Sequence, residues 1–175
     1  MIYDITHILP AYNEARRIHE TVTQAVEYFA RKEWTAQIIV SADGVDGTRE
    51  IVREMAQSNP HLLCIGEDAR RGKGRGIREA VALASGRYIG FADADNKVPI
   101  EDFDTILPWL EKGTEVVIGS RALARSSIEK SQPLYRRIGG KTFGYVMRFL
   151  TELSVGDTQC GFKFFPHHVA KALFS

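Results

Sequence analysis

Residues 86–95 have the sequence GRYIGFADAD, a short apolar run followed by two aspartates that are separated by one residue. The run is typical of a buried strand. Asp93 and Asp95 at its end can hold one divalent cation together, and Mg²⁺ is typically bound by one or two carboxylates plus substrate phosphates. The alternative is a pair of solvated acids in a turn, so the rest of the chain has to decide between the two.

Composition indicates an ordinary globular chain. It has 175 residues, 44% hydrophobic and 26% charged, and a net charge of +1 that gives no reason to expect nucleic-acid binding. Cys64 and Cys160 fit neither a disulfide framework nor a zinc spacing. Asp4 and His7 interrupt the first apolar run, so we expect no signal peptide. Residues 169–175 resemble a helix without a stop signal, and we expect a continuation beyond them.

Strand and helix patterns alternate along the first 120 residues. Strands are expected at 5–9, 37–42, 62–65, 88–92 and 115–119, and helices from 13 or 14, from 48, after 74 and over 99–110. This alternation predicts an α/β fold whose mainly parallel sheet is covered by helices on both faces. Ligands of such sheets bind at the carboxyl ends of the strands.

Polar motifs follow these strands in a fixed order. They are PAYNE at 10–14, DGVDGT at 43–48, RGKG at 71–74, DAD at 93–95, GSR at 119–121 and DTQCGFK at 157–163. This order resembles the family 2 glycosyltransferases, and the last motif looks most like that of the dolichyl-phosphate glucosyltransferases. The resemblance implies a single GT-A domain over residues 1–175, with a Rossmann-like, mainly parallel sheet. It also implies an inverting, metal-dependent hexosyltransferase with a DXD motif.

The resemblance places the nucleoside against the first motif. Pro10 is expected to end the first strand and turn the backbone toward a base, with Tyr12, Asn13 and Glu14 beside it. Asn13 could instead cap a helix, and Glu14 is favoured at a helix start by the macrodipole alone. Both alternatives stay open.

Asp43 follows the second strand and could accept the ring N–H of uracil. The alternative is a turn residue before Gly44. The family usually has two adjacent acids here, whereas this chain has one and apparently one residue fewer. Asp46 is better explained as a helix cap.

The diphosphate is expected near the glycine-rich motif and the DXD motif. Backbone N–H groups with Arg71 or Lys73 can approach phosphates there, although a surface turn is the alternative. Asp95 is the more direct ligand of Mg²⁺ or Mn²⁺, and Asp93 would serve the metal or the ribose. Arg121 could contact diphosphate or sugar, or be a surface arginine.

Asp157 is the candidate catalytic residue, as the base or as a positioning group for a phosphate acceptor that is already ionised; a turn or capping residue is the alternative. Arg136 and Arg137 lie in the basic, aromatic segment 134–153. That segment is either an ordinary packed helix or a membrane-surface helix that binds the lipid phosphate.

The favoured function is transfer of glucose from UDP-glucose, with GDP-mannose as the second donor, to polyprenyl or dolichyl phosphate. The enzyme would be peripheral at the cytoplasmic membrane face. The alternatives are a non-catalytic nucleotide-binding module of the same fold and a transferase acting on a soluble saccharide.

Overall fold

The computed structural model describes residues 2–119 and 160–175. The elements in chain order are β1 (Tyr3–Tyr12), α1 (Ile18–Arg31), β2 (Ala36–Asp43), α2 (Thr48–Ser58), β3 (Leu62–Ile65), α3 (Lys73–Leu83), β4 (Gly86–Phe91), η1 (Ile100–Asp102), α4 (Phe103–Glu111), β5 (Val117–Ile118), β6 (Lys163–Pro166) and α6 (His167–Leu173). The chain divides into two units, Met1–Val117 with Gly161–Ser175, and Ile118–Cys160. Most of the second unit lies outside the described residues, and the extent of the domain stays a prediction.

The sheet has the strand order β3-β2-β1-β4-β6-β5. β1 is parallel to β2 and β4, and β2 is parallel to β3. The mainly parallel sheet is therefore confirmed. One strand was not predicted: β6 runs antiparallel to β4, with Phe91 opposite Lys163.

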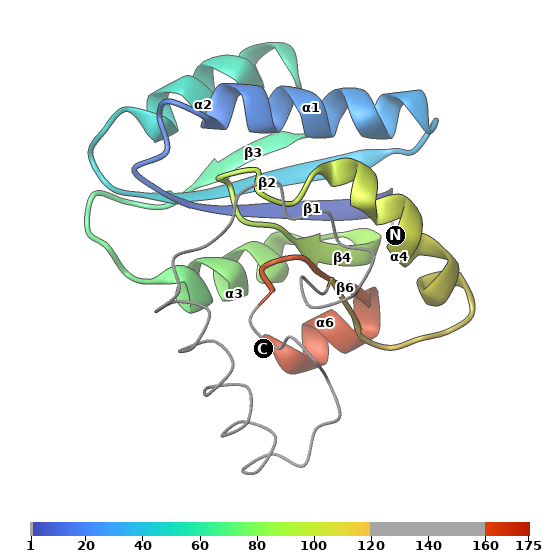
Figure 1. Ribbon diagram of the computed structural model, residues 1–175. Coiled ribbons are helices and arrows are strands. Elements are labelled where there is room, and N and C mark those ends of the chain that lie inside the picture. The colour runs from blue at the N-terminus through green and yellow to red at the C-terminus, as the bar shows by residue number, and fades with distance from the viewer. Residues whose placement is uncertain (1, 120–159) are drawn as a thin grey trace, which may run out of the picture. The chain divides into compact units, whose positions relative to one another are not determined.

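Helices cover both faces of the sheet, as the alternation predicted. α1 and α2 lie on one face, and α3 and α6 lie on the other (Figure 1). α1 buries Ile18, Val22, Ala25 and Phe29, which recur at the helical period and therefore share one face.

Each face of the sheet has its own core. On the α3 and α6 face, aliphatic residues of three strands pack with Phe165 and Ala170. On the α1 face the core is aromatic: Phe103 lies 4.8 Å from Phe164 and 5.9 Å from Phe29 between ring centroids. β6 serves both cores, because Phe164 and Phe165 are both buried and adjacent residues of a strand point to opposite faces.

Pro10 does not end the first strand, which continues to Tyr12. Pro10 pairs in register with Ser41 of β2 but lies beyond the last β1–β4 pair, Ile8 with Phe91. The missing N–H therefore removes no hydrogen bond on the β4 side, and the strand tolerates the proline.

The first helix begins later than expected. Asn13 has a left-handed backbone, with φ of 56°, and α1 starts only at Ile18. The helix expected over residues 99–110 is α4, which runs through Pro108 to Glu111. Phe103 and Leu110, near its two ends, are buried. Packing of that helical face outweighs the local effect of the proline.

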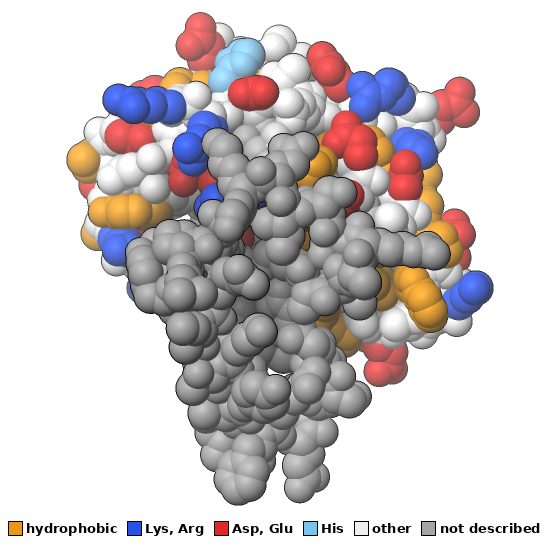
Figure 2. Space-filling model, viewed as in Figure 1, with side chains coloured by type: hydrophobic (Ala, Val, Ile, Leu, Met, Phe, Trp, Pro, Cys, Tyr) orange, Lys and Arg blue, Asp and Glu red, His pale blue; other side chains and the backbone are white. Residues whose placement is uncertain are grey.

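Among the described residues, no helix is both long and apolar enough to cross a membrane. On the coloured part of the surface in Figure 2, acidic and basic side chains are interspersed. This mixture agrees with the net charge of +1.

Candidate nucleotide and metal site

The carboxyl ends of β1, β2 and β4 present the polar residues that the sequence singled out. Tyr12 and Asp43 are the last residues of β1 and β2 and lie opposite each other in register. Asp93 follows β4 by two residues. Because these strands are parallel, their carboxyl ends share one edge of the sheet, and the fold brings these residues to that edge.

The segment after β1 is fastened to the segment after β2. Asn13 Oδ1 accepts a hydrogen bond from the Val45 N–H at 3.2 Å, and the Glu14 N–H donates to Thr48 Oγ1 at 2.9 Å. A Cβ on Gly44 would lie 2.0 Å from Asn13 Oδ1, so only glycine fits there. Asn13 therefore acts in this contact as a loop fastener, and it does not cap α1.

Tyr12 presents a partly exposed ring at this edge, with 44% of the residue accessible. The Arg70 guanidinium lies 4.5 Å from the ring centroid. A planar base can stack on such a surface, as it can on other exposed aromatic rings.

Asp46 is not the N-cap of α2. That position is Gly47, whose φ of 93° is left-handed, and it has no side-chain capping bond. Asp46 instead accepts hydrogen bonds from the N–H and hydroxyl of Thr48 and from the Ala15 N–H. Desolvation opposes the effect, but these bonds outweigh it and lower the pKa of Asp46.

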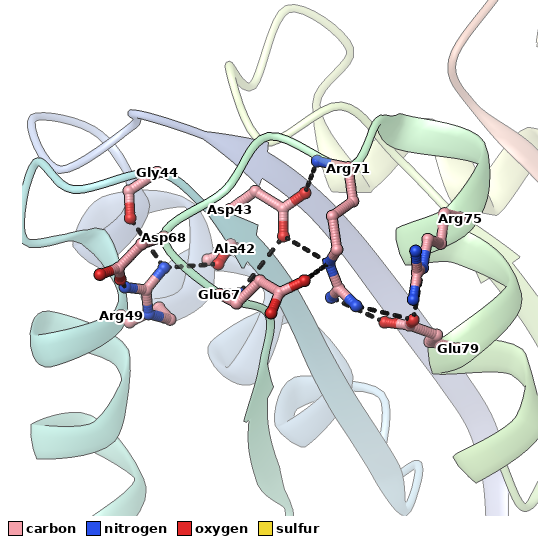
Figure 3. A network of polar contacts seen from close by, with 9 residues as sticks. All are labelled: Ala42, Asp43, Gly44, Arg49, Glu67, Asp68, Arg71, Arg75 and Glu79. Carbon is pink, nitrogen blue, oxygen red and sulfur yellow. Dashed lines mark hydrogen bonds and ion pairs between the residues drawn. The ribbon is translucent and has the colours of Figure 1, made fainter.

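Asp43 is buried and anchors the loop between β3 and α3 (Figure 3). Its Oδ2 accepts a hydrogen bond from the Arg71 N–H at 2.8 Å, and its Oδ1 accepts one from the Glu67 N–H at 3.4 Å. The shortened motif thus leaves its single acid as a structural acceptor for backbone donors.

Arg71 is held by carboxylates on three sides. Its two terminal nitrogens donate to Glu79 at 2.9 Å each, a bidentate pair, and its Nε lies 2.6 Å from Glu67 and 3.7 Å from Asp43. The Nε contacts are ion pairs without hydrogen-bond geometry. In this arrangement the guanidinium fixes the loop, and its predicted contact with nucleotide stays a prediction.

Arg49 is a buried arginine close to this network, and no sequence pattern singled it out. Its Nη1 donates to the carbonyls of Ala42 at 3.2 Å and Gly44 at 2.8 Å, and its Nη2 pairs with Asp68 (Figure 3). The sequence of a helix does not show that one of its arginines is buried. The burial of Arg49 depends on partners that are brought to it only by the tertiary fold.

The DXD carboxylates each pair with a lysine. Lys73 Nζ contacts Asp93 Oδ1, and Lys97 Nζ contacts Asp95 Oδ2. Lys73 is the first residue of α3, which has no acid in its first turn and whose N-terminus is capped by no side chain of the described part of the chain. Unsatisfied N–H groups and the helix dipole make that end attractive to an anion such as phosphate.

The two carboxylates suit a divalent cation. Each already attracts an ammonium group, and carboxylate oxygens are the donors that Mg²⁺ and Mn²⁺ accept. In the described ranges, no cluster of three or more His, Cys, Asp or Glu side chains is placed to hold a metal. These residues allow a site in which two protein carboxylates bind the cation and phosphate and water fill its remaining coordination positions.

Two further residues beside Asp93 were missed. A Cβ on Gly161 would lie 2.1 Å from Asp93 Oδ2, so the absence of a side chain makes room for the carboxylate. His7 and Asp93 line one narrow cavity with about 10 Å³ of space for the centre of a water molecule, which is close to the size of one water site. Within residues 2–119 and 160–175, His7 Nδ1 has no hydrogen-bond partner, and burial lowers the pKa of His7 to about 4.

The remaining predicted site residues lie outside the described residues. They are Arg121, Arg136, Arg137 and Asp157. Their predicted roles in diphosphate binding, acceptor binding and catalysis stay predictions.

Comparison with known proteins adds independent information. The model of the family "Glycosyl transferase family 2" matches residues 6–174. A dolichyl-phosphate beta-glucosyltransferase of Trichomonas vaginalis is 31% identical over 180 residues, which cover 97% of this chain and 53% of that protein. The protein of the same name from Drosophila melanogaster is 28% identical over 190 residues, covering 98% and 57%. The chain thus spans about half the length of these relatives.

Solved structures share the fold. A mannosyltransferase from Pyrobaculum calidifontis in complex with GDP-Man and Mn²⁺ has a TM-score of 0.65 at 24% identity, covering 98% of this chain and 46% of that one. A glucosyl-3-phosphoglycerate synthase from Mycobacterium tuberculosis in complex with Mn²⁺, UDP and phosphoglyceric acid has a TM-score of 0.62 at 18% identity, covering 95% and 57%. The GT-A fold is therefore confirmed.

Proposed function

Because the chain belongs to glycosyl transferase family 2, we propose that its protein transfers glucose from UDP-glucose to a polyprenyl or dolichyl phosphate with inversion. The observation that carries this proposal is the ion pair of Asp93, in the DXD motif with Asp95, to Lys73, the first residue of α3. A cation site and an anion site side by side suit a sugar diphosphate.

In the proposed reaction a phosphate oxygen of the acceptor attacks the anomeric carbon of glucose. The bond to the donor's diphosphate breaks, and UDP leaves with the bonding electrons. A divalent cation held by Asp93 and Asp95 would neutralise the charge that develops on the leaving diphosphate. The N–H groups at the start of α3 would bind the same diphosphate.

The choice of donor and acceptor follows the relatives. Proteins that carry the name dolichyl-phosphate beta-glucosyltransferase are 31% and 28% identical to the chain over nearly all of its length. Support for a divalent metal comes from structural neighbours that contain Mn²⁺ together with GDP-Man or UDP. We place the base against Tyr12 and near Asp43, and GDP-mannose remains the second donor.

A radiolabelled transfer assay on the full-length protein tests the proposal. UDP-glucose, GDP-mannose and UDP-N-acetylglucosamine are each supplied with Mn²⁺ and dolichyl phosphate. We expect label from UDP-glucose to enter the organic phase as glucosyl phospholipid. Asp95→Ala should abolish this transfer, whereas Glu54→Ala, an exposed acid on α2, should leave it unchanged.

A different product would point to the second candidate function. The phosphoglyceric acid in one structural neighbour is a water-soluble acid, which favours a soluble acceptor as the alternative. Label that stays in a water-soluble phosphate or saccharide product, with none in lipid, would exclude the polyprenyl phosphate acceptor.

We also propose that the protein is peripheral at the cytoplasmic membrane face, through the basic residues Arg136 and Arg137. It should co-sediment with anionic liposomes at low salt and dissociate at high salt, because salt screens exposed charges. Changing both arginines to glutamate should prevent co-sedimentation but leave UDP binding intact. A parent protein that stays in the supernatant at low salt would contradict this localisation.

A further inference from the structure

The oxygens of the DXD carboxylates have close neighbours on the protein itself. Asp93 Oδ1 contacts Lys73 Nζ, and Asp93 Oδ2 lies 2.1 Å from the Cβ position that Gly161 leaves empty. Asp95 Oδ2 contacts Lys97 Nζ, while its Oδ1 accepts the Lys97 N–H at 3.3 Å. A cation that takes Asp93 Oδ1 or Asp95 Oδ2 as a ligand must displace an ammonium group.

Such a displacement costs little free energy, because the pairs are accessible to water. The side chains of Lys73 and Asp93 are 46% and 49% exposed. In the second pair, Lys97 is 80% exposed and Asp95 is 19% exposed, so water reaches that pair from the lysine side. Ion pairs of this kind contribute about 0–1 kcal/mol, and a lysine ammonium is a mobile point charge on a flexible stem. The lysines neutralise the carboxylates without being fixed to them.

The two lysines differ in where they can go when released. Lys73 is the first residue of α3, so its backbone is fixed at the helix N-terminus, and in the paired state its ammonium lies 5.9 Å from the Phe91 ring centroid. A phosphate bound at that N-terminus would lie within its reach. Lys97 follows Asp95 by two residues and extends into solvent, away from any such anchor among the described residues.

We propose that Lys73 and Lys97 compete with the divalent cation for Asp93 and Asp95 and so set its affinity. Lys73, once released from Asp93, then binds the phosphates of the donor. This inference rests on the proposed use of a nucleotide-diphosphate sugar and assigns opposite roles to two residues of one charge. Lys97 only weakens binding of the cation. Lys73 weakens binding of the cation but strengthens binding of the nucleotide.

Two titrations of the full-length protein test the proposal. The first follows free Mn²⁺ by electron paramagnetic resonance without nucleotide. Lys97→Met and Lys73→Met should each tighten Mn²⁺ binding about two- to fivefold, because an exposed competitor is removed. Lys112→Met, an exposed lysine at the end of α4, is the matched control and should bind Mn²⁺ like the parent.

The second titration measures UDP binding by calorimetry with saturating Mn²⁺. Lys73→Met should weaken UDP binding about tenfold, whereas Lys97→Met should not weaken it. This opposite response separates competition from a general loss of structure, which would lower both affinities. It also gives a readout that does not depend on transfer activity.

Each result either supports or overturns the competition. The competition is overturned if both lysine variants bind Mn²⁺ with the same affinity as the parent and Lys112→Met. The proposed transfer function would survive that result if UDP binding and lipid labelling are observed. Tighter Mn²⁺ in both variants without lipid labelling would keep the competition and contradict the proposed acceptor. No Mn²⁺ binding by the parent or by either variant would overturn the competition and the metal assignment together.

Discussion

The carboxyl edge of the sheet contains two acidic regions with different partners. Asp43 has a side chain that is 10% exposed, and it accepts hydrogen bonds from backbone N–H groups beside the Arg71 guanidinium. Asp93 has a side chain that is 49% exposed and pairs with a flexible lysine. Two aspartates at the ends of parallel strands on either side of β1 thus differ in their partners: Asp43 is fixed to the fold, and Asp93 is free to change partners.

The largest effect should follow from removing the buried guanidinium on the fixed side. Arg49→Met leaves the carbonyls of Ala42 and Gly44 without their charged donor, which should lower the free energy of unfolding by about 3–4 kcal/mol. Urea unfolding measures it. Arg53→Met is the control on the same helix, since its side chain is 60% exposed and its ion pair with Glu50 spans 4.0 Å. Equal losses in the two variants would mean that the Arg49 network does not stabilise the fold.

Lowering the pH should reduce the stability of the fold through the buried His7. Burial lowers the pKa of His7 from 6.5 to about 4, so between these values the unfolded chain binds the proton more readily than the folded one. Stability therefore falls as the pH falls from 6.5 to 4, by at most about 3 kcal/mol. His7→Leu should remove this part of the loss in urea unfolding at pH 7, 5.5 and 4.5. The control is His168→Leu, which changes an exposed histidine. If stability depends on pH in His7→Leu as it does in His168→Leu, the prediction is contradicted.

Asp43 itself should show a smaller loss of stability together with a loss of ligand affinity. Asp43→Ala removes the acceptor for the Arg71 and Glu67 N–H groups, and we expect a loss of about 2 kcal/mol in unfolding free energy. UDP affinity should also fall. Asp43→Asn keeps one acceptor oxygen and should be intermediate in stability. Unchanged UDP affinity with reduced stability would show that Asp43 only supports the loop.

The smallest effect on stability is expected on the exchangeable side. Gly161→Ala would place a Cβ 2.1 Å from Asp93 Oδ2, but the carboxylate can rotate toward solvent. Stability should therefore change by less than about 1 kcal/mol, whereas Mn²⁺ affinity should fall severalfold. Gly74→Ala has no atom within 4 Å of the added Cβ and is the control. Parental Mn²⁺ affinity in Gly161→Ala would show that the space beside Asp93 is not needed.

The sequence predicted the fold where the signal is local. The apolar runs of β2, β3 and β4 and the helical period of α1 are visible within a few residues. β6 was missed because it has four residues, contains Pro166, and is specified by pairing with a strand about seventy residues earlier. The local sequence around Phe164 and Phe165 does not indicate a strand. Only the pairing with β4 shows one.

The same distinction holds for the site. Asp93, Asp95 and Asp43 could be predicted because each directly follows or ends an apolar run. Gly161 could not, since it reaches Asp93 only through the tertiary fold. His7 did leave a sign in the sequence, a titratable residue inside an apolar strand, but its missing partner is visible only in the packed core.

The insertion of β6 beside β4 also sets the order in which the protein can fold during synthesis. β3, β2, β1 and β4 are complete once residue 91 has emerged, but the free edge of β4 waits for Lys163–Pro166. At about 5–20 residues per second this delay is roughly 4–14 s, during which an unpaired strand edge and the Phe164 contacts of Phe103 remain open. A ribosome-bound chain of this protein is therefore most exposed to mispairing at β4 between the synthesis of residue 91 and that of Lys163–Pro166, and pairing with β6 then protects this edge.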